Sequence, residues 1–255
     1  MVNVLNIPMF NQDIDHACQL VLTAIESGET RSSRCISATG AHGLVHAKKN
    51  PEFATVLKSF HLNLPDGMPG VWIGRLKGES QMRRCYGPEF FAQVMKRSAG
   101  RKVRHFFCGG KEGVAIELAE KCKIRFGSDN IVGAFSPPFT EMTDDELAEL
   151  GGRLESLNVD VVWIGLSTPK QEMFASRLRR FCKVHFIVTV GAAFDFHTDR
   201  VRQAPAWIQN LGLEWLFRLF MEPKRLYRRY LEIVPLFIYY NLSEFVRFAV
   251  KKERI

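Results

Sequence analysis

The sequence predicts an α/β fold with a mostly parallel sheet and flanking helices. Short apolar runs rich in β-branched and aromatic residues alternate with helical stretches of ten or more residues, as in parallel strands joined by crossover helices. The runs lack alternating polar residues, which is typical of strands buried on both faces. After residue 202 only helical patterns remain. We therefore expect a Rossmann-like α/β domain at residues 1–202 and a basic, helical C-terminal appendage at residues 203–255.

The composition limits the class of protein and the kind of partner. A chain of 255 residues with 46% hydrophobic and 24% charged residues can form a full core. Its net charge of +8 suggests an anionic partner, such as a nucleotide, a nucleic acid or an acidic membrane surface. The six scattered cysteines lack metal-ligand spacing and suit a cytosolic protein. We expect no signal peptide, and no run approaches the ~20 apolar residues that would span a membrane.

The first third of the chain contains helices, two strands and a row of glycines. The expected elements are a helix at 11–27, a strand at 34–38, a helical region at 45–60 and a short strand at 61–64. Pro51 interrupts the helical region, so we expect a break and a restart there. Gly70, Gly74 and Gly78 have the spacing that clears one face of a helix. Close packing of that helix is the expected reason, and contact with a ligand is the alternative.

The rest of the α/β region alternates regularly between strands and helices. Strands are expected at 103–108, 131–135, 161–164 and 185–190, with intervening helices that end near residues 124, 157 and 180. Thr143 and Glu146 form a capping-box pattern at the start of the second of these helices. Ser167 and Thr168 are N-cap residue types before the third, and Pro169 suits its first position.

Polar residues and glycines follow the carboxyl ends of the predicted strands, the edge at which open α/β sheets bind ligands. Near residue 168 a helix N-terminus would suit an anion, although an ordinary capped turn has the same pattern. Asp66 lies in a Pro-Asp-Gly turn tripeptide, and as an exposed carboxylate it could also act as a general base. The residues expected to converge on one crevice are Thr39, Asp66, Gly109, Gly110, Lys170, Gln171 and Asp195.

The appendage combines basic and aromatic residues. Lys224 and Arg228, like Arg225 and Arg229, are i, i+4 neighbours, where like charges repel by roughly 0.2–0.5 kcal/mol per pair. An anionic partner would offset this repulsion. The apolar run at 233–240 is too short to cross a bilayer but suits a helix lying on an acidic membrane surface. A solvated basic helix with an aromatic core face is the alternative.

Two other functions are compatible with parts of the sequence. The glycine loop after Cys108 suggests a nicotinamide-dependent oxidoreductase, but it is neither G-x-G-x-x-G nor a Walker A sequence. Ser136 and Pro137 also stand where an acidic residue would bind the ribose. The second alternative is a non-catalytic module that binds nucleic acid. Because the basic residues gather in the C-terminal helices rather than along a groove with stacking aromatics, we do not expect nucleic acid as the partner.

Eight short blocks follow one another along the chain. They are Pro65-Asp66-Gly67-Met68-Pro69, Arg84-Cys85-Tyr86-Gly87-Pro88-Glu89, Phe107-Cys108-Gly109-Gly110, Gly165-Leu166-Ser167-Thr168-Pro169-Lys170-Gln171-Glu172, Val190-Gly191-Ala192-Ala193-Phe194-Asp195-Phe196, Gln203-Ala204-Pro205, Gly212-Leu213-Glu214-Trp215 and Glu222-Pro223-Lys224-Arg225-Leu226. In content and order they resemble the signature blocks of the WecG/TagA/CpsF glycosyltransferases, glycosyltransferase family 26. So many ordered matches are highly specific for the family and much less so for a substrate.

The resemblance implies an inverting transferase that moves a sugar from a UDP-sugar to a polyprenyl-diphosphate-linked sugar. It places this reaction at the cytoplasmic face of the bacterial plasma membrane, in teichoic acid, enterobacterial common antigen or exopolysaccharide synthesis. Asp66 would be the base, and neither a metal nor another cofactor is expected. With the strand-end pattern, the expected substrate-binding residues are Thr39, Arg84, Gly109, Gly110, Thr168, Lys170, Gln171 and Asp195. The residues expected to contact the membrane or the acceptor are Arg218, Lys224, Arg225, Arg228 and Arg229.

Two departures from the family pattern leave the donor sugar open, with N-acetylmannosamine as the candidate. Many members have Thr-x-Asn after the first strand, whereas this chain has Thr39-Gly40. Members often have Asp-Phe-x-x-Gly after a later strand, whereas Asp195-Phe196 is followed here by His197-Thr198-Asp199. The resemblance also leaves the oligomeric state open, a homo-oligomer included.

Overall fold

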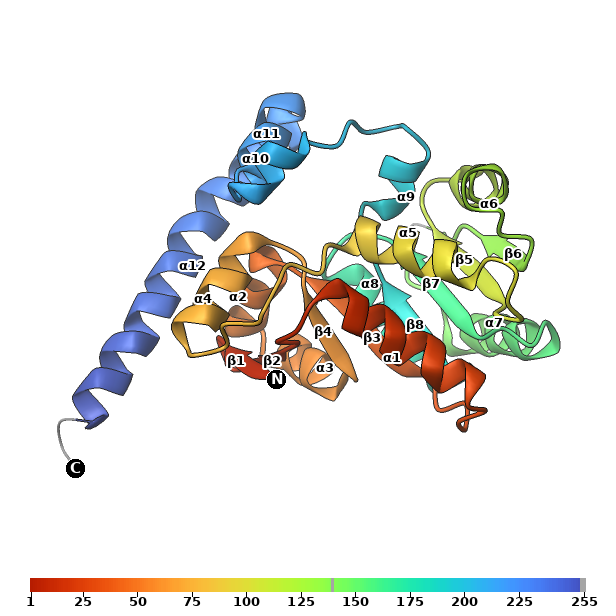
Figure 1. Ribbon diagram of the computed structural model, residues 1–255, viewed down its shortest axis with the longest axis horizontal. Helices are drawn as coiled ribbons and strands as arrows, with labels where there is room; N and C mark the ends of the chain where they lie inside the picture. Colours follow the sequence, from red (N-terminus) through yellow and green to blue (C-terminus); the bar gives the residue numbers. More distant parts are fainter. Residues whose placement is uncertain (139, 253–255) are drawn as a thin grey trace.

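A six-stranded sheet forms the centre of the computed structural model, which describes residues 1–138 and 140–252 (Figure 1). All strand pairings in this sheet are parallel, in the order β4-β3-β8-β7-β5-β6. The predicted α/β class and all the predicted strands are thereby confirmed. The strands are β3 (Arg34–Thr39), β4 (Leu62–Pro65), β5 (His105–Gly109), β6 (Ile131–Phe135), β7 (Val161–Gly165) and β8 (Phe186–Thr189).

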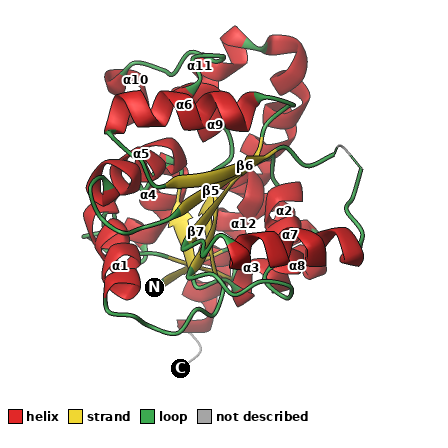
Figure 2. Ribbon diagram, turned by 90° about the vertical axis from the view of Figure 1, so that its right-hand side faces the viewer, coloured by secondary structure: helices red, strands yellow, loops and turns green. Residues whose placement is uncertain are grey.

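Helices cover both faces of the sheet (Figure 2), as the unbroken apolar strands require. In the interior strand β7 every residue is buried, and Trp163 packs edge-on against Phe90 and Phe91. Its Nε1 donates a hydrogen bond of 3.1 Å to Nδ1 of His105, which satisfies both buried polar groups. One face carries α1 (Ile14–Glu26), α5 (Gly87–Ser98), α6 (Val114–Phe126) and α9 (Ala193–His197), and the other carries α3 (Pro51–Ser59), α7 (Asp144–Ser156) and α8 (Lys170–Leu178).

Two predicted helix boundaries are confirmed. The break at Pro51 separates α2 (Ala41–Lys49) from α3, and the side chain of Asn50 caps α3 by accepting a hydrogen bond from the Phe53 N–H at 3.1 Å. The capping box of α7 is also present. The hydroxyl of Thr143 accepts from the Glu146 N–H at 3.2 Å, and the Glu146 carboxylate accepts from the Thr143 N–H at 2.6 Å.

Two other predictions are wrong at helix ends. Gly78 lies beyond the end of α4 (Met68–Leu76) in a left-handed conformation, so it does not share a helix face with Gly74. A Cβ at Gly74 would lie 2.1 Å from Sδ of Met82, which supports close packing as the reason for that glycine. Helix α8 begins at Lys170 rather than at Pro169, after a cis Thr168–Pro169 bond, and no side chain caps it.

Several elements were not predicted from the sequence. An antiparallel hairpin joins β1 (Val2–Val4) and β2 (Ile7–Met9) through Leu5 and Asn6, whose φ angles are 51° and 66°. Its strands are too short to give a periodic signal, and its turn lacks the glycine that usually marks a left-handed conformation. Helices α5 and α9 were also missed.

The described part of the C-terminal region contains helices and no strands, as predicted. It consists of α10 (Ala206–Asn210), α11 (Glu214–Met221) and α12 (Pro223–Lys252). Ile233 and Phe237 of α12 are buried in the same core cluster as Leu44 and Val45 of α2, so the long helix packs on the α/β region. None of the described helices has the length and apolar composition needed to cross a membrane.

Adjacent glycines in α7 test how tightly that helix packs. A Cβ at Gly151 would lie 2.0 Å from the Phe181 carbonyl oxygen, whereas a Cβ at Gly152 would meet nothing within 4 Å. Gly152→Ala should therefore raise the free energy of unfolding by about 0.5–1 kcal/mol, the helix-propensity gain. Gly151→Ala should lower it by about 1–3 kcal/mol, because the collision displaces a backbone. Urea unfolding of both variants checks this, and equal effects would contradict the packing.

Candidate active site

A cleft of about 1740 Å³ runs along the carboxyl edge of the sheet and is walled on one side by α11 and α12. Segments that follow β3, β4, β5, β7 and β8 all contribute to its lining, as the parallel sheet requires. Of the residues expected in the crevice or at the acceptor, those that line the cleft are Asp66, Arg84, Gly110, Thr168, Lys170, Gln171, Asp195, Arg218, Arg225 and Arg229. Thr39, Gly109, Lys224 and Arg228 do not line it.

Asp66 directly follows β4 and remains partly accessible from the cleft. Its Oδ1 accepts a hydrogen bond of 2.8 Å from the Gly87 N–H. A Cβ at Gly87 would lie 3.0 Å from the Val190 carbonyl oxygen, so a side chain at that position would be crowded. Burial raises the pKa of the Asp66 carboxyl, while the Arg84 charge and the Gly87 N–H act in the opposite direction. The carboxylate is thus held in place and is more basic than a free aspartate.

Arg84 connects Asp66 to the appendage. Its Nε donates to the Asp66 carbonyl oxygen at 2.7 Å, and its guanidinium forms an ion pair with Glu214 of α11. Tyr86 donates to the same Glu214 carboxylate at 2.7 Å, and Arg84 stacks on the Tyr86 ring at 3.9 Å. These bonds occupy much of the guanidinium, so the structure gives Arg84 a positioning role, and its contact with substrate stays a prediction.

A buried carboxylate organises the loop between β7 and α8. Oε1 of Glu172 accepts hydrogen bonds from the Thr168 hydroxyl at 2.9 Å, the Gln171 amide at 2.9 Å and the Ser37 hydroxyl at 3.2 Å. Oε2 is buried without a hydrogen-bond partner among the described residues. Burial raises the pKa of this carboxyl, and the three donors act against that rise. Sequence reasoning quoted Glu172 without a role, because a glutamate in a helical first turn usually faces solvent.

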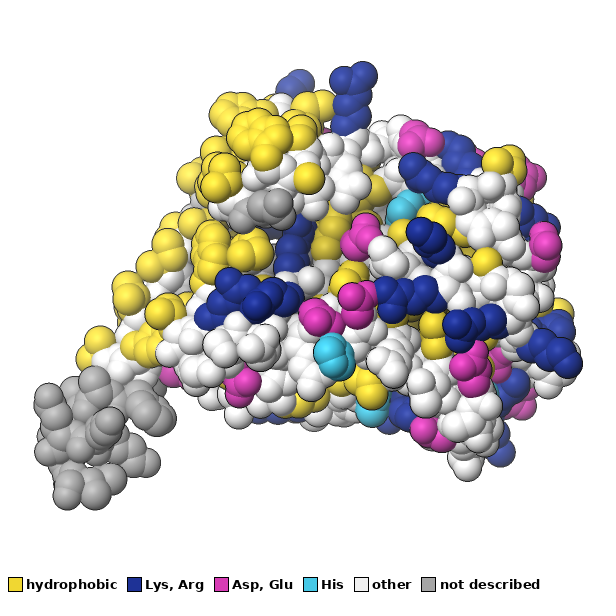
Figure 3. Space-filling view, viewed as in Figure 1, with side chains coloured by type: hydrophobic (Ala, Val, Ile, Leu, Met, Phe, Trp, Pro, Cys, Tyr) yellow, Lys and Arg dark blue, Asp and Glu magenta, His cyan; other side chains and the backbone are white. Residues whose placement is uncertain are grey.

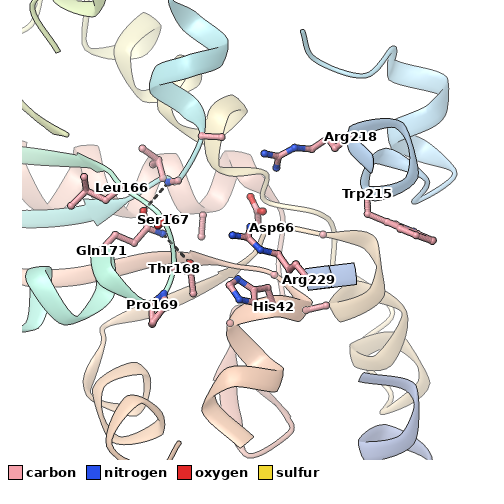
Figure 4. Close-up of a pocket in the computed structure, with 18 of the residues that line it drawn as sticks. His42, Asp66, Leu166, Ser167, Thr168, Pro169, Gln171, Trp215, Arg218 and Arg229 are labelled. Carbon is pink, nitrogen blue, oxygen red and sulfur yellow. Dashed lines mark hydrogen bonds between the residues drawn. The ribbon is translucent and has the colours of Figure 1, made fainter. Parts of the chain in front are cut away.

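Thr39 and Gln171 support the same network. The Thr39 hydroxyl donates to the Ser37 hydroxyl at 2.9 Å, and Thr39 is buried and does not line the cleft. Oε1 of Gln171 accepts from the Gly191 N–H at 3.0 Å and ties α8 to the segment after β8 (Figure 4). Both residues lie near the cleft, but their polar atoms already bond within the protein. Their direct contact with substrate stays a prediction.

The remaining strand-end residues have different surroundings. Gly109, at φ 145°, brings β5 so close to β7 that a Cβ would lie 2.6 Å from the Gly165 carbonyl oxygen. Gly110 donates to that same oxygen at 2.9 Å and lines the cleft. Lys170 is exposed at the cleft edge. Asp195 of α9 faces the cleft, and burial raises its pKa against the nearby Arg225 charge.

Three arginines of the appendage enter the cleft. Arg218 belongs to α11, while Arg225 and Arg229 belong to α12. Figure 4 shows Arg218 and Arg229 reaching toward Asp66 from the two helices. Nε of Arg218 is buried without a partner in the described part of the chain. Burial lowers the pKa of Arg229, and the charges of Arg225 and Arg218 act in the same direction. An anion in the cleft would relieve both penalties.

The other two residues predicted to contact the membrane or the acceptor lie outside the cleft. Lys224 and Arg228 are exposed, and Nε of Arg228 donates to the Tyr227 hydroxyl at 2.8 Å. The five cations predicted for the membrane or acceptor therefore form two groups. Arg218, Arg225 and Arg229 line the cleft, although Arg225 is largely exposed and also pairs with Glu222, whereas Lys224 and Arg228 lie outside the cleft and face solvent.

His42 is a cleft residue that sequence reasoning missed. It lies in the first turn of α2, beside Arg229 in Figure 4. Burial lowers the pKa of its imidazole to about 4, and the Arg229 charge acts in the same direction. The ring is therefore neutral near pH 7 and can donate and accept hydrogen bonds. Its position just after the Thr39-Gly40 strand end was the available signal.

No cluster of three or more His, Cys, Asp or Glu side chains suited to a metal ion occurs among the described residues. One Asp-x-Asp, a motif by which a metal ion could be held, occurs in the sequence at Asp13 and Asp15. Asp13 caps α1 by accepting from the His16 N–H at 2.9 Å, and Asp15 pairs with Arg97, so neither lines the cleft. The cleft thus combines the carboxyl groups of Asp66 and Asp195, whose pKa values are raised, with a group of cations, which suits attack by a hydroxyl on a phosphorylated substrate.

Comparisons with known proteins agree with this chemistry. The model of the Glycosyl transferase WecG/TagA/CpsF family matches residues 2–251, which include the appendage. A protein of Bacillus spizizenii strain W23, named N-acetylglucosaminyldiphosphoundecaprenol N-acetyl-beta-D-mannosaminyltransferase, is 30% identical over 187 residues. The matched region covers 73% of this chain and 70% of that relative.

The raised pKa of Glu172 predicts a pH-dependent effect on stability. The folded protein holds this proton more tightly than the unfolded chain, so the stabilising contribution of the group is greatest at low pH. It declines as pH rises from the unfolded pKa of about 4.3 through the raised folded pKa. Glu172→Gln removes this decline, because an amide does not titrate. The variant has a lower stability by an amount that does not change with pH, because the new amide N–H groups lie where Oε2 has no partner and therefore lack an acceptor.

We therefore expect the difference in unfolding free energy, Glu172→Gln minus wild type, to become more positive as pH increases from about 4 to 7. Urea titrations at several pH values measure it. Glu120→Gln, at an exposed position of α6, is the control for removal of a surface carboxylate. A difference that does not change with pH would show that the Glu172 pKa is not raised.

Proposed function

The chain belongs to the WecG/TagA/CpsF family of glycosyltransferases, and we propose that it moves a sugar from a UDP-sugar to a polyprenyl-diphosphate-linked sugar. The product would be a bacterial cell-surface polysaccharide or a teichoic acid. The name of the Bacillus relative supports a lipid-linked acceptor and makes N-acetylmannosamine the leading candidate for the donor sugar. Because the chain belongs to this family, we discard the two alternatives, the oxidoreductase and the module that binds nucleic acid.

The position of Asp66 in the cleft supports its role as the general base. Gly87 bonds to one carboxylate oxygen, so the other can take the proton of an acceptor hydroxyl. The hydroxyl oxygen attacks the anomeric carbon while the bond between that carbon and the UDP oxygen breaks, and the configuration at the carbon is inverted. UDP leaves with the bonding electron pair. The raised pKa of Asp66 makes the carboxylate a better base for this step.

The cleft arginines supply positive charge for the two diphosphates of the proposed reaction, that of UDP and that of the lipid-linked acceptor. Arg218, Arg225 and Arg229 come from two helices and line the same cleft as Asp66, and Figure 4 shows Arg218 and Arg229 reaching toward the carboxylate. The single observation that carries the proposal is that the Asp66 carboxylate and three arginines of the appendage line one cleft. We propose that Arg218, which acts on the Asp66 carboxyl, stabilises the leaving group without a metal, whereas Arg225 and Arg229 of α12 bind the acceptor's diphosphate.

The outer surface of the appendage suits a membrane. Figure 3 shows apolar side chains gathered over α10, α11 and α12. They include Phe220, Leu231 and Tyr239, which are 76%, 72% and 64% exposed. With Lys224 and Arg228 nearby, they form a surface that is both apolar and cationic, as in interfacial helices. We propose peripheral attachment to the inner face of the plasma membrane, where the lipid-linked acceptor would be reached.

Asp66→Asn should lower kcat by about 10²- to 10⁴-fold, because the amide cannot take the proton. UDP affinity should change little. Release of UDP from a panel of UDP-sugars, with a short-chain prenyl-diphosphate-N-acetylglucosamine acceptor, measures the rate, and EDTA in the same assay tests for a required metal. For wild type, kcat/KM should fall on acidification with a midpoint above about 3.9, the ordinary aspartate pKa. Full turnover by the variant would remove Asp66 from the base role.

The two groups of basic residues should separate in their effects. Arg225→Gln and Arg229→Gln should each lower kcat/KM by about tenfold or more with a water-soluble acceptor, because a charged contact to diphosphate is lost. Lys224→Gln and Arg228→Gln are matched controls on the same helix, and they should mainly weaken flotation with acidic vesicles. Equal losses of kcat/KM in both pairs would argue against the division into a cleft group and a membrane group.

A further inference from the structure

The active-site cleft continues into a groove between α4 and α12. Helix α4 begins at Met68, two residues after Asp66, and the first two turns of α12 carry Arg225 and Arg229. Both helices therefore lead away from the proposed site, and Figure 1 shows them side by side. Farther along, Nζ of Lys77 lies 2.8 Å from Oε1 of Glu244 and links the end of α4 to α12.

The lining of this groove changes from cationic to apolar with distance from Asp66. On α12 the arginines at 225 and 229 line the end near the start of the helix, and mainly apolar side chains, with the buried Asn241 among them, line the following turns. The i, i+4 spacing keeps these positions on one helix face. Helix α4 contributes a matching apolar row at the same spacing. The apolar residues that carry the argument are Met68, Trp72 and Leu76 of α4, and Val234, Ile238 and Leu242 of α12.

The groove leaves large apolar side chains open to solvent. Trp72 and Leu76 are 45% and 71% exposed, and Ile238 and Leu242 are 53% and 60% exposed. Apolar surface gathered along one groove favours an apolar occupant. The stretch from Arg229 to Leu242 rises ~20 Å along the helix axis, which is long enough for several isoprene units.

We propose that this groove binds the first isoprene units of the lipid-linked acceptor while Arg225 and Arg229, at the start of the groove, bind its diphosphate. The inference rests on the proposed function and adds that the enzyme recognises the lipid as well as the sugar. An anionic head followed by a hydrocarbon chain matches the observed sequence of cations and then apolar residues. Leu231 lies outside the cleft on the same helix, so a bilayer can contact α12 there without filling the groove.

The test compares acceptors that differ only in chain length. Dimethylallyl, geranyl and geranylgeranyl diphosphate-N-acetylglucosamine are each assayed below their micelle-forming concentrations, without vesicles. Wild type should gain about tenfold or more in kcat/KM from the shortest to the longest chain, because each buried methylene adds affinity. Leu76→Gln and Leu242→Gln should reduce this gain, while Leu231→Gln, an equally exposed change outside the cleft, should keep it. Calorimetric binding of the corresponding sugar-free prenyl diphosphates gives the same comparison without turnover.

The outcomes separate the groove from the proposed function. A wild-type enzyme that uses or binds all chain lengths equally well would overturn the groove and leave the transferase function standing. If prenyl diphosphates bind more tightly as their chains lengthen, but no sugar is transferred, the groove would be supported and the proposed transferase function would be contradicted. If the groove variants weakened vesicle binding or self-association but kept the chain-length gain, the groove would be a membrane or subunit contact, and the proposal would be wrong.

Discussion

Burial of the sheet on both faces is the constraint on which the rest of the structure depends. Strands such as β7 have no solvated side, so helices must return across both faces and every strand must run in the same direction. The carboxyl ends of the strands then all meet at one edge, where backbone amides and polar side chains remain unpaired by the sheet. Asp66, Gly110 and Gln171 lie in one cleft for this reason, although they are far apart in the sequence.

The appendage completes a site that the sheet alone leaves open. Burial of Ile233 and Phe237 fixes the rotation of α12, and this rotation turns Arg225 and Arg229 into the cleft while Arg228 faces solvent. The ion pair between Arg84 and Glu214 holds α11 beside the Asp66 backbone. Cations from the appendage and a carboxylate from the sheet thus meet because ordinary core packing brings them together.

Buried polar groups determine how precisely the strand-end loops are held. Glu172 gathers donors from β3 and from the β7–α8 loop, and Gln171 extends the connection to the segment after β8. A buried carboxylate is costly, so such a network is retained only where its hydrogen bonds compensate. Its effect is to fix loop geometry along the cleft, which is a separate task from contacting a ligand.

The sequence by itself determined the fold class, the order of the strands along the chain and the residues at their carboxyl ends. Apolar runs and helical periodicity are local properties, and the family blocks added the reaction class. Only the tertiary structure decided which side chains reach the cleft. Thr39 turns toward Ser37, Gly109 packs against β7, and the basic residues of α12 divide between cleft and solvent. These orientations depend on which face of each element is buried against residues distant in sequence, and no local pattern contains that information.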